Sequence, residues 1–199
     1  MFKAAFGSLG FDEPSQIREA NRIDDVLPLL EFAEARAVAG AYVVAMLSYE
    51  AAPAFDSVLT TQTPAEFPLA WAAVFPAASE IDGRPPGEFV SGEWQPRVSK
   101  SEYANALGRI RELIAAGDTY QVNYSFPLTS TFSGDAYAWY RELCLAQGGA
   151  RYCAYLDLER YHVLSLSPEL FFEREGDQVL TRPMKGTVRR GRWPEEDEA

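Results

Sequence analysis

A cluster of basic side chains near the end of the chain carries the clearest chemical signal in an otherwise acidic sequence. Five of the eighteen lysines and arginines fall within eleven positions: Arg182, Lys185, Arg189, Arg190 and Arg192. Guanidinium groups can hold a carboxylate in bidentate geometry, and a lysine among positive charges loses its proton more readily. Lys185 would then serve as a nucleophile or base toward a small anionic ligand. The same residues also fit a solvated basic face on a hairpin, and charge clustering alone does not separate the two interpretations.

A glutamate between two apolar segments is the second candidate. Glu169 lies between the segments 162–167 and 170–172, both rich in leucine, valine or phenylalanine. Burial there would raise the pKa of its carboxyl group, so that the protonated form could donate a proton to a departing hydroxyl. The alternative is a surface glutamate at the start of a strand, which the local sequence favours when taken alone.

Weaker signals receive no catalytic role. Residues 117–123 combine a helix stop with polar amides on one face of a following strand, which ordinary turn chemistry also explains. His162 has no second histidine with which to share a metal, and we expect a hydrogen-bonded structural residue. Cys144 and Cys153 do not form a Cys-x-x-Cys pair, so we expect both to be small buried hydrophobic residues rather than metal ligands or a disulfide framework.

Helical periodicity predicts three helices that could support these residues. They extend over 24–39, 99–116 and 133–147. The two aspartates at 24–25 are candidate caps of the first helix. The second begins with a capping-box pair, Ser99 and Glu102, and the third begins at either Ser133 or Asp135.

Strand patterns surround the candidate site residues. Strands are expected at 41–49, 69–76, 120–128, 151–158, 162–167, 170–174 and 178–184. The uniformly apolar segment 41–49 predicts a buried strand, and 120–128 alternates apolar and polar residues with a period of two. Helices and strands do not alternate regularly along the chain. We therefore expect an α+β fold with mixed or antiparallel sheets flanked by helices, rather than a doubly wound fold.

Composition excludes several classes of function. A formal net charge of −11 argues against binding to nucleic acid or to an anionic membrane surface, because both need a surplus of lysine and arginine. The apolar content of 47% predicts a folded globular protein. No apolar run reaches the length of a membrane span, and the N-terminus lacks a signal-peptide core. The predicted location is the cytoplasm.

Four segments together resemble one enzyme family. They read LSYEAAPAFD at 47–56, IAAGDTYQVNYSFPL at 114–128, LSPELFFERE at 166–175 and TRPMKGTVRRG at 181–191. In this order and spacing they resemble the chorismate-utilising enzymes, which include anthranilate synthase, isochorismate and salicylate synthases, and component I of aminodeoxychorismate synthase. The resemblance implies a chorismate-utilising enzyme fold.

The last segment resembles aminodeoxychorismate synthase component I in particular. That branch has Pro-x-Lys-Gly-Thr here, whereas anthranilate synthases carry alanine in place of the lysine. By this resemblance, Lys185 attacks C2 of chorismate, Glu169 protonates the departing C4 hydroxyl, and ammonia displaces the lysine to give 4-amino-4-deoxychorismate. Gly186 and Thr187 would help to seat the substrate. The product would feed 4-aminobenzoate and folate synthesis.

The resemblance also implies partners, a cofactor and a domain organisation. Ammonia would come from a glutamine amidotransferase subunit, and Mg²⁺ would bridge protein carboxylates to the substrate carboxylate. The family continues beyond the motifs present here, so we expect the magnesium ligands outside residues 1–199 and the sequence to be an N-terminal part. Residues 1–96 would form an N-terminal α+β segment, and 97–199 the first part of the chorismate-binding catalytic domain.

Two alternatives remain open from the sequence. One is a non-catalytic fragment or module that contacts the amidotransferase. The other is a different chorismate enzyme, such as an anthranilate synthase.

Overall fold

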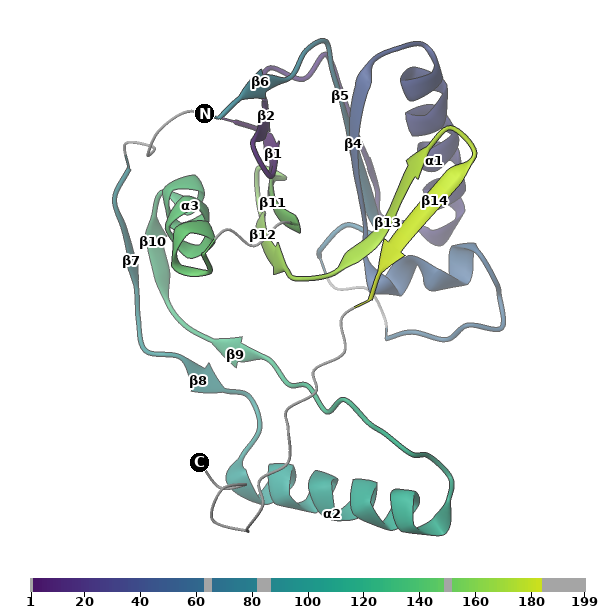
Figure 1. Ribbon diagram of the computed structural model, residues 1–199, viewed down its shortest axis with the longest axis vertical. Helices are drawn as coiled ribbons and strands as arrows, with labels where there is room; N and C mark the ends of the chain where they lie inside the picture. Colours follow the sequence, from purple (N-terminus) through teal and green to yellow (C-terminus); the bar gives the residue numbers. More distant parts are fainter. Residues whose placement is uncertain (1, 63–65, 82–86, 149–151, 184–199) are drawn as a thin grey trace. The chain divides into compact units, whose positions relative to one another are not determined.

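The structure is a computed structural model that describes residues 2–62, 66–81, 87–148 and 152–183 (Figure 1). The described residues form two compact units. One contains residues up to 81 together with those from Tyr140 onward, and the other contains residues 87–139. The architecture is α+β with antiparallel sheets, as the sequence predicted.

The first unit contains a three-stranded antiparallel sheet in the order β3-β5-β4. Its members are β3 (Gln16–Ala20), β5 (Ala70–Phe75) and β4 (Tyr42–Leu47). All six residues of the central strand β5 are buried. Because alternate residues of a strand point to opposite faces, such burial requires a hydrophobic partner on each side of the sheet.

Helix α1 (Ile23–Val38) covers one of these faces (Figure 1). Its buried residues Val26, Leu29 and Ala33 share a core cluster with the alanines at positions 70 and 72 of β5. The small alanine side chains let the helix approach the sheet closely. Each of the larger buried side chains contributes about 1.5–3 kcal/mol by leaving water.

The opposite face of β5 belongs to a second core cluster. Trp71, Ala73 and Phe75 pack there with residues of a five-stranded antiparallel sheet in the order β12-β11-β1-β2-β6. The strands of that sheet are β12 (His162–Ser167), β11 (Tyr152–Asp157), β1 (Ala4–Phe6), β2 (Leu9–Phe11) and β6 (Ser79–Glu80). The Phe11 and Phe75 rings lie 5.3 Å apart, which joins the two sheets at one core.

The last described strands of the first unit are β13 (Leu170–Glu175) and β14 (Gln178–Arg182), which form a hairpin. The sequence Glu175-Gly176-Asp177 predicts a turn between these strands, and the structure confirms it, with Gly176 at a φ of 58°. A positive φ at this position favours glycine because other residues would meet steric conflict.

The second unit contains helix α2 (Lys100–Ala116), the first turn of α3 (Ala136–Ala146) and two short strand pairs. The pairs are β7 (Phe89–Ser91) with β10 (Phe132–Gly134), and β8 (Gln95–Pro96) with β9 (Leu128–Thr129). Aromatic rings gather beside the first pair, where Phe132 stacks on Trp139 at 4.8 Å between ring centroids. No residue of α2 is buried.

The predicted capping box of α2 is present in full. Ser99 Oγ accepts a hydrogen bond from the Glu102 backbone N–H at 3.2 Å, and Glu102 Oε2 accepts one from the Ser99 N–H at 2.7 Å. Donation from the Ser99 backbone, and then from its hydroxyl, lowers the pKa of Glu102. Gly117, with a φ of 83°, ends the helix as predicted.

The N-terminus of helix α3 shows which of the two predicted residues, Ser133 or Asp135, is its cap. Asp135 Oδ1 accepts hydrogen bonds from the backbone N–H groups of Tyr137 and Ala138, at 2.9 and 3.0 Å. These donors are two of the groups that every helix leaves unsatisfied at its N-terminus. Asp135 is therefore the cap, and Ser133 instead belongs to β10.

Three predictions about local structure are wrong in the described residues. Segment 121–127 is not a strand, because no described segment pairs with it. Strand β4 forms where expected but lies at the edge of its sheet, and only Val44 in it is buried. The N-cap of α1 is Arg22, so the aspartates at 24–25 occupy its first turn, where their charges favour the positive end of the helix dipole.

Candidate functional site

Glu169 lies in a tight connection between two strands of the first unit. Strand β12 is anchored to β11 by the pair Tyr152↔Ser167, and β13 begins at Leu170. Ser167 Oγ accepts a hydrogen bond from the Glu169 N–H at 3.1 Å and donates to the Glu169 carbonyl oxygen at 3.0 Å. The serine hydroxyl thus satisfies both backbone groups of Glu169 and holds the connection in a turn.

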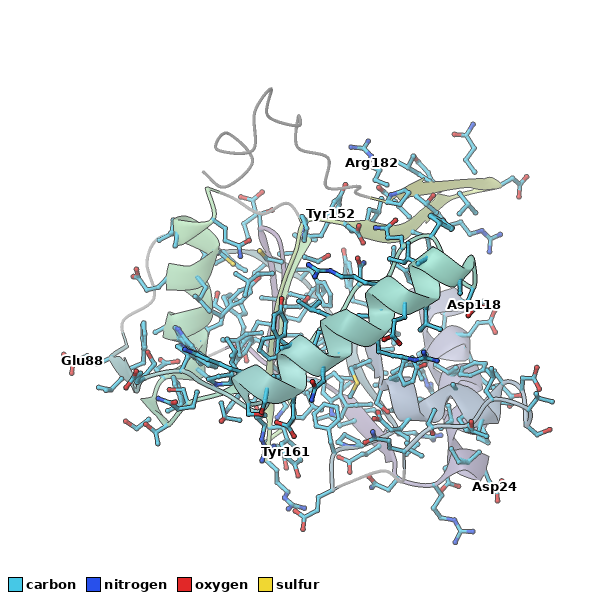
Figure 2. All side chains as sticks on the ribbon, turned by 90° about the horizontal axis from the view of Figure 1, so that it is seen from below. Asp24, Glu88, Asp118, Tyr152, Tyr161 and Arg182 are labelled. Carbon is cyan, nitrogen blue, oxygen red and sulfur yellow. The ribbon has the colours of Figure 1, made fainter. Side chains whose placement is uncertain are left out.

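The register of the β13–β14 hairpin brings this turn to the end of β14. Leu170, which directly follows Glu169, pairs with Arg182. Arg182 lies at the open end of the hairpin, where Figure 2 labels it. The next residue, Pro183, is the first of the Pro-x-Lys-Gly-Thr motif. The structure therefore brings Glu169 close to the residues that immediately precede the motif.

The other candidate site residues lie outside the described part of the chain. Lys185, Gly186 and Thr187 follow Pro183, the last described residue. The arginines at 189, 190 and 192 also lie outside it. Their roles remain predictions from the sequence.

The expected burial of Glu169 is not found. Its side chain is exposed, which fits the alternative of a surface glutamate at the start of a strand. The apolar residues that follow it do not enclose it, because Phe171 and Phe172 are 87% and 57% exposed. Between Leu170 and Glu173 the strand register shifts by one residue, so this part of β13 is irregular. The role of Glu169 as a proton donor stays a prediction.

A hollow of about 430 Å³ lies on the same hairpin but does not suit the predicted ligand. It is lined by Glu173, Glu175, Gln178, Val179 and Leu180. Two carboxylates without a lining lysine or arginine among these residues would repel a dicarboxylic acid. The hairpin carries two basic side chains: Arg182 at its open end, beside the Glu169 turn, and Arg174 near its closed end, where Nε donates a hydrogen bond to the Gly176 carbonyl oxygen at 2.9 Å.

The polar segment after α2 shows turn chemistry. Thr119 Oγ1 donates a hydrogen bond to the carbonyl oxygen of Gln121 at 3.1 Å, and the amide side chains of Gln121 and Asn123 are exposed. This segment belongs to the second unit. Turn chemistry is therefore sufficient to explain the polar residues of this segment.

His162 has the structural role expected from the sequence. Its Nδ1 lies 3.0 Å from the hydroxyl of Tyr155, and the two rings stack with centroids 5.9 Å apart. The pair lies on the adjacent strands β11 and β12. No cofactor is needed to explain this histidine.

Among residues 2–62, 66–81, 87–148 and 152–183, no group of three or more histidine, cysteine, aspartate or glutamate side chains could hold a metal ion. The described residues therefore offer no ligand set for the magnesium that the sequence resemblance implies. In the same part of the chain, no helix has the length and apolar character to cross a membrane.

Comparisons with known proteins agree with the segments quoted from the sequence. Aminodeoxychorismate synthase component 1 of Escherichia coli K12 is 35% identical over 108 residues, which cover 54% of this chain and 24% of that protein. The Bacillus subtilis protein of the same name is 31% identical over 129 residues, covering 65% and 27%. Anthranilate synthase component 1 of Thermus thermophilus is 38% identical over 114 residues, covering 56% and 24%.

These matches span about a quarter of the length of the curated relatives. Their identities are similar for both enzyme names and do not separate the two activities. The family model for chorismate binding enzymes matches residues 80–199, which is more than half of the chain and includes the Glu169 turn, the β13–β14 hairpin and the Pro-x-Lys-Gly-Thr motif. This chain belongs to the family of chorismate binding enzymes.

Proposed function

We propose that this chain carries part of the active site of an aminodeoxychorismate synthase component 1, which converts chorismate and ammonia to 4-amino-4-deoxychorismate. The observation that carries the proposal is the lysine at position 185 within Pro183-Met184-Lys185-Gly186-Thr187. The relatives named aminodeoxychorismate synthase component 1, at 31–38% identity, support it.

The proposed reaction uses two side chains of this chain. The neutral amine of Lys185 forms a bond to C2 of chorismate, the two ring double bonds shift to C1=C6 and C4=C5, and the C4 hydroxyl leaves as water with a proton from Glu169. Ammonia then bonds to C4, both double bonds shift back to C5=C6 and C1=C2, and the lysine leaves C2 as a free amine. Gly186 and Thr187 help to seat the substrate.

The described geometry supports placing both groups at one site. The turn that carries Glu169 and the strand that leads to Lys185 are joined by the Leu170↔Arg182 pair. Arg182 also supplies a positive charge beside the Glu169 turn, where a substrate carboxylate would be stabilised. The described residues leave the Glu169 side chain exposed. Apolar groups that would bury its carboxyl group must therefore come from the substrate or from protein outside the described residues.

The proposal also includes a partner subunit and a metal cofactor. Ammonia would come from a glutamine amidotransferase subunit, and Mg²⁺ would be held by carboxylates outside this chain.

A covalent intermediate gives a direct test of Lys185. A form of the protein that aminates chorismate should accumulate, when ammonia is withheld, a protein mass increased by chorismate less one water. The chain has lysines at positions 3, 100 and 185, so peptide mapping can assign the adduct. We expect Lys185→Ala to abolish it and the surface variant Lys100→Ala to retain it. An adduct that persists in Lys185→Ala would overturn the assignment.

The proton donor needs its own test. Glu169→Gln should slow adduct formation by about 10²–10⁴-fold, the usual contribution of a positioned general acid. Glu173→Gln, on the same hairpin and also exposed, is the matched control and should react at the wild-type rate. Equal rates for the two variants would remove Glu169 from the mechanism.

Anthranilate synthase activity is the second candidate, because a relative with that name is 38% identical over 114 residues. The product separates the two functions. Anthranilate is a fluorescent aromatic amine, whereas 4-amino-4-deoxychorismate keeps the enolpyruvyl group. Formation of anthranilate, with no adduct on Lys185, would favour the second candidate.

A further inference from the structure

Helix α3 and strand β11 bring the two cysteines of the chain together. The rings of Tyr140 on α3 and Tyr155 on β11 lie 5.6 Å apart between centroids. Cys144 is one helical turn beyond Tyr140, a displacement of about 6 Å along the same helix face. Cys153 is two residues before Tyr155, about 6.7 Å along the same strand face. These matched displacements place Cys144 against Cys153.

The side-chain contacts agree with this register. Cys144 lies close enough to Cys153 and to the Tyr140 hydroxyl to raise the pKa of both groups. Cys153 is 3% exposed, whereas Cys144 is half-buried. Neither thiol is part of a disulfide in the structure. Figure 1 shows α3, the helix that contains Cys144, beside the β11–β12 pair, in which β11 contains Cys153.

We propose that Cys144 and Cys153 are a redox-active pair, which forms an intrachain disulfide when a small disulfide such as oxidised glutathione acts on the protein. The Cys144 thiolate attacks the disulfide and releases one glutathione thiolate, leaving a mixed disulfide. The Cys153 thiolate then attacks the Cys144 sulfur and releases the second glutathione. Two protein thiols are oxidised, and one molecule of oxidised glutathione is reduced to two thiols.

The different surroundings of the two thiols determine the order of these steps. Cys144 is the more accessible, so it meets the oxidant first. Burial, and next the proximity of Cys144, raises the pKa of the Cys153 thiol to about 11. Because only the thiolate attacks, closure of the disulfide should accelerate by about tenfold for each pH unit between 7 and 9.

The crosslink would tie α3 to the strand pair that leads to the Glu169 turn. Cys153 pairs with Leu166 across the β11–β12 ladder, and its neighbour Tyr152 pairs with Ser167, the residue that holds Glu169. Oxidation would therefore restrain the strand on which this turn depends. The formation of the disulfide itself does not depend on the proposed enzymatic function.

Mass spectrometry of the whole chain after treatment with oxidised glutathione tests the pair. We expect a loss of two hydrogen atoms, the disappearance of both thiols in a colorimetric thiol assay, one peptide that links positions 144 and 153, and a monomer on a non-reducing gel. The chain has two cysteines, so the assignment is unambiguous.

Single variants separate the attacking and resolving roles. Cys153→Ser should stop at a stable glutathione adduct on Cys144. Cys144→Ser should react at least about tenfold more slowly, because its remaining thiol is buried. The proposal is overturned if the wild-type protein keeps both thiols, retains glutathione on Cys144 while Cys153 stays free, or forms disulfides between two chains.

Discussion

Replacing Gly134 by alanine provides a stringent test of the second unit. Gly134 is the last residue of β10, has a φ of 106° and pairs with Phe89 of β7. A Cβ atom at this position would lie 2.7 Å from Phe89 Cα and closer still to the carbonyl oxygen of Glu88. Both neighbours are backbone atoms, so a change of side-chain rotamer cannot relieve the overlap.

The expected loss of stability follows from three contributions. An alanine held at this φ costs about 1–3 kcal/mol of backbone strain. Overpacking adds about 1–3 kcal/mol. Moving the Glu88 carbonyl also disturbs its 2.9 Å hydrogen bond from the Asp135 N–H, a bond worth about 1 kcal/mol. We expect Gly134→Ala to lower the free energy of unfolding of this unit by roughly 3–7 kcal/mol.

Two other glycines of the same unit serve as matched controls. Gly117 has a φ of 83° with open space around a new Cβ, so Gly117→Ala should cost only about 1 kcal/mol of backbone strain. Gly108 lies within α2 and also has open space, so Gly108→Ala should stabilise the helix by about 0.5–1 kcal/mol. The three variants separate steric overlap from backbone strain and from helix propensity.

Urea unfolding of the full chain, followed by tryptophan fluorescence and far-ultraviolet circular dichroism, would measure these effects. Trp139 reports on the region directly, because its ring stacks on Phe132 of β10 and lies 6.0 Å from Phe89 of β7. The expected order of stability is Gly108→Ala, wild type, Gly117→Ala and Gly134→Ala. If Gly134→Ala were as stable as Gly117→Ala, the described close approach of β7 and β10 would be refuted.

Two further predictions concern the α2 cap and the buried titrating groups. Ser99→Ala removes one half of the capping box and should weaken the start of α2 by about 1 kcal/mol, seen as faster hydrogen exchange at the Glu102 amide; unchanged exchange would contradict the cap. Burial raises the pKa of Tyr140 above its usual range and that of Cys153 from 9 to about 11, so both neutral forms stabilise the folded state. This stabilisation is complete below the unfolded pKa values and is lost as pH rises through the folded ones, about 2–3 kcal/mol for the thiol between pH 9 and pH 11. Urea midpoints measured across this range should fall less in Cys153→Ala than in the wild type, and equal slopes would contradict the buried thiol.

Structure that depends on neighbouring residues was predictable from the sequence. The capping box of α2, the glycine that ends it and the turn at 175–177 all use hydrogen bonds or dihedral angles within a few residues. The apolar run at 69–76 also predicted strand β5, although not its burial on both faces. For the candidate site, the order of four motifs indicated the family that the comparison over residues 80–199 shows.

Features that depend on contacts between segments far apart in the chain could be recognised only in the tertiary structure. Segment 120–128 has a strand pattern, yet strand formation needs a pairing segment that is not found in the described residues. Burial of β4 and of Glu169 depends on which elements cover them, and neither periodicity nor residue type specifies that cover. The proximity of Cys144 and Cys153 likewise arises because α3 packs against β11 through Tyr140 and Tyr155, so two cysteines that no sequence motif links become neighbours. Local hydrogen bonds and dihedral preferences are properties of short segments, whereas burial and side-chain proximity are decided by packing between segments far apart in the chain.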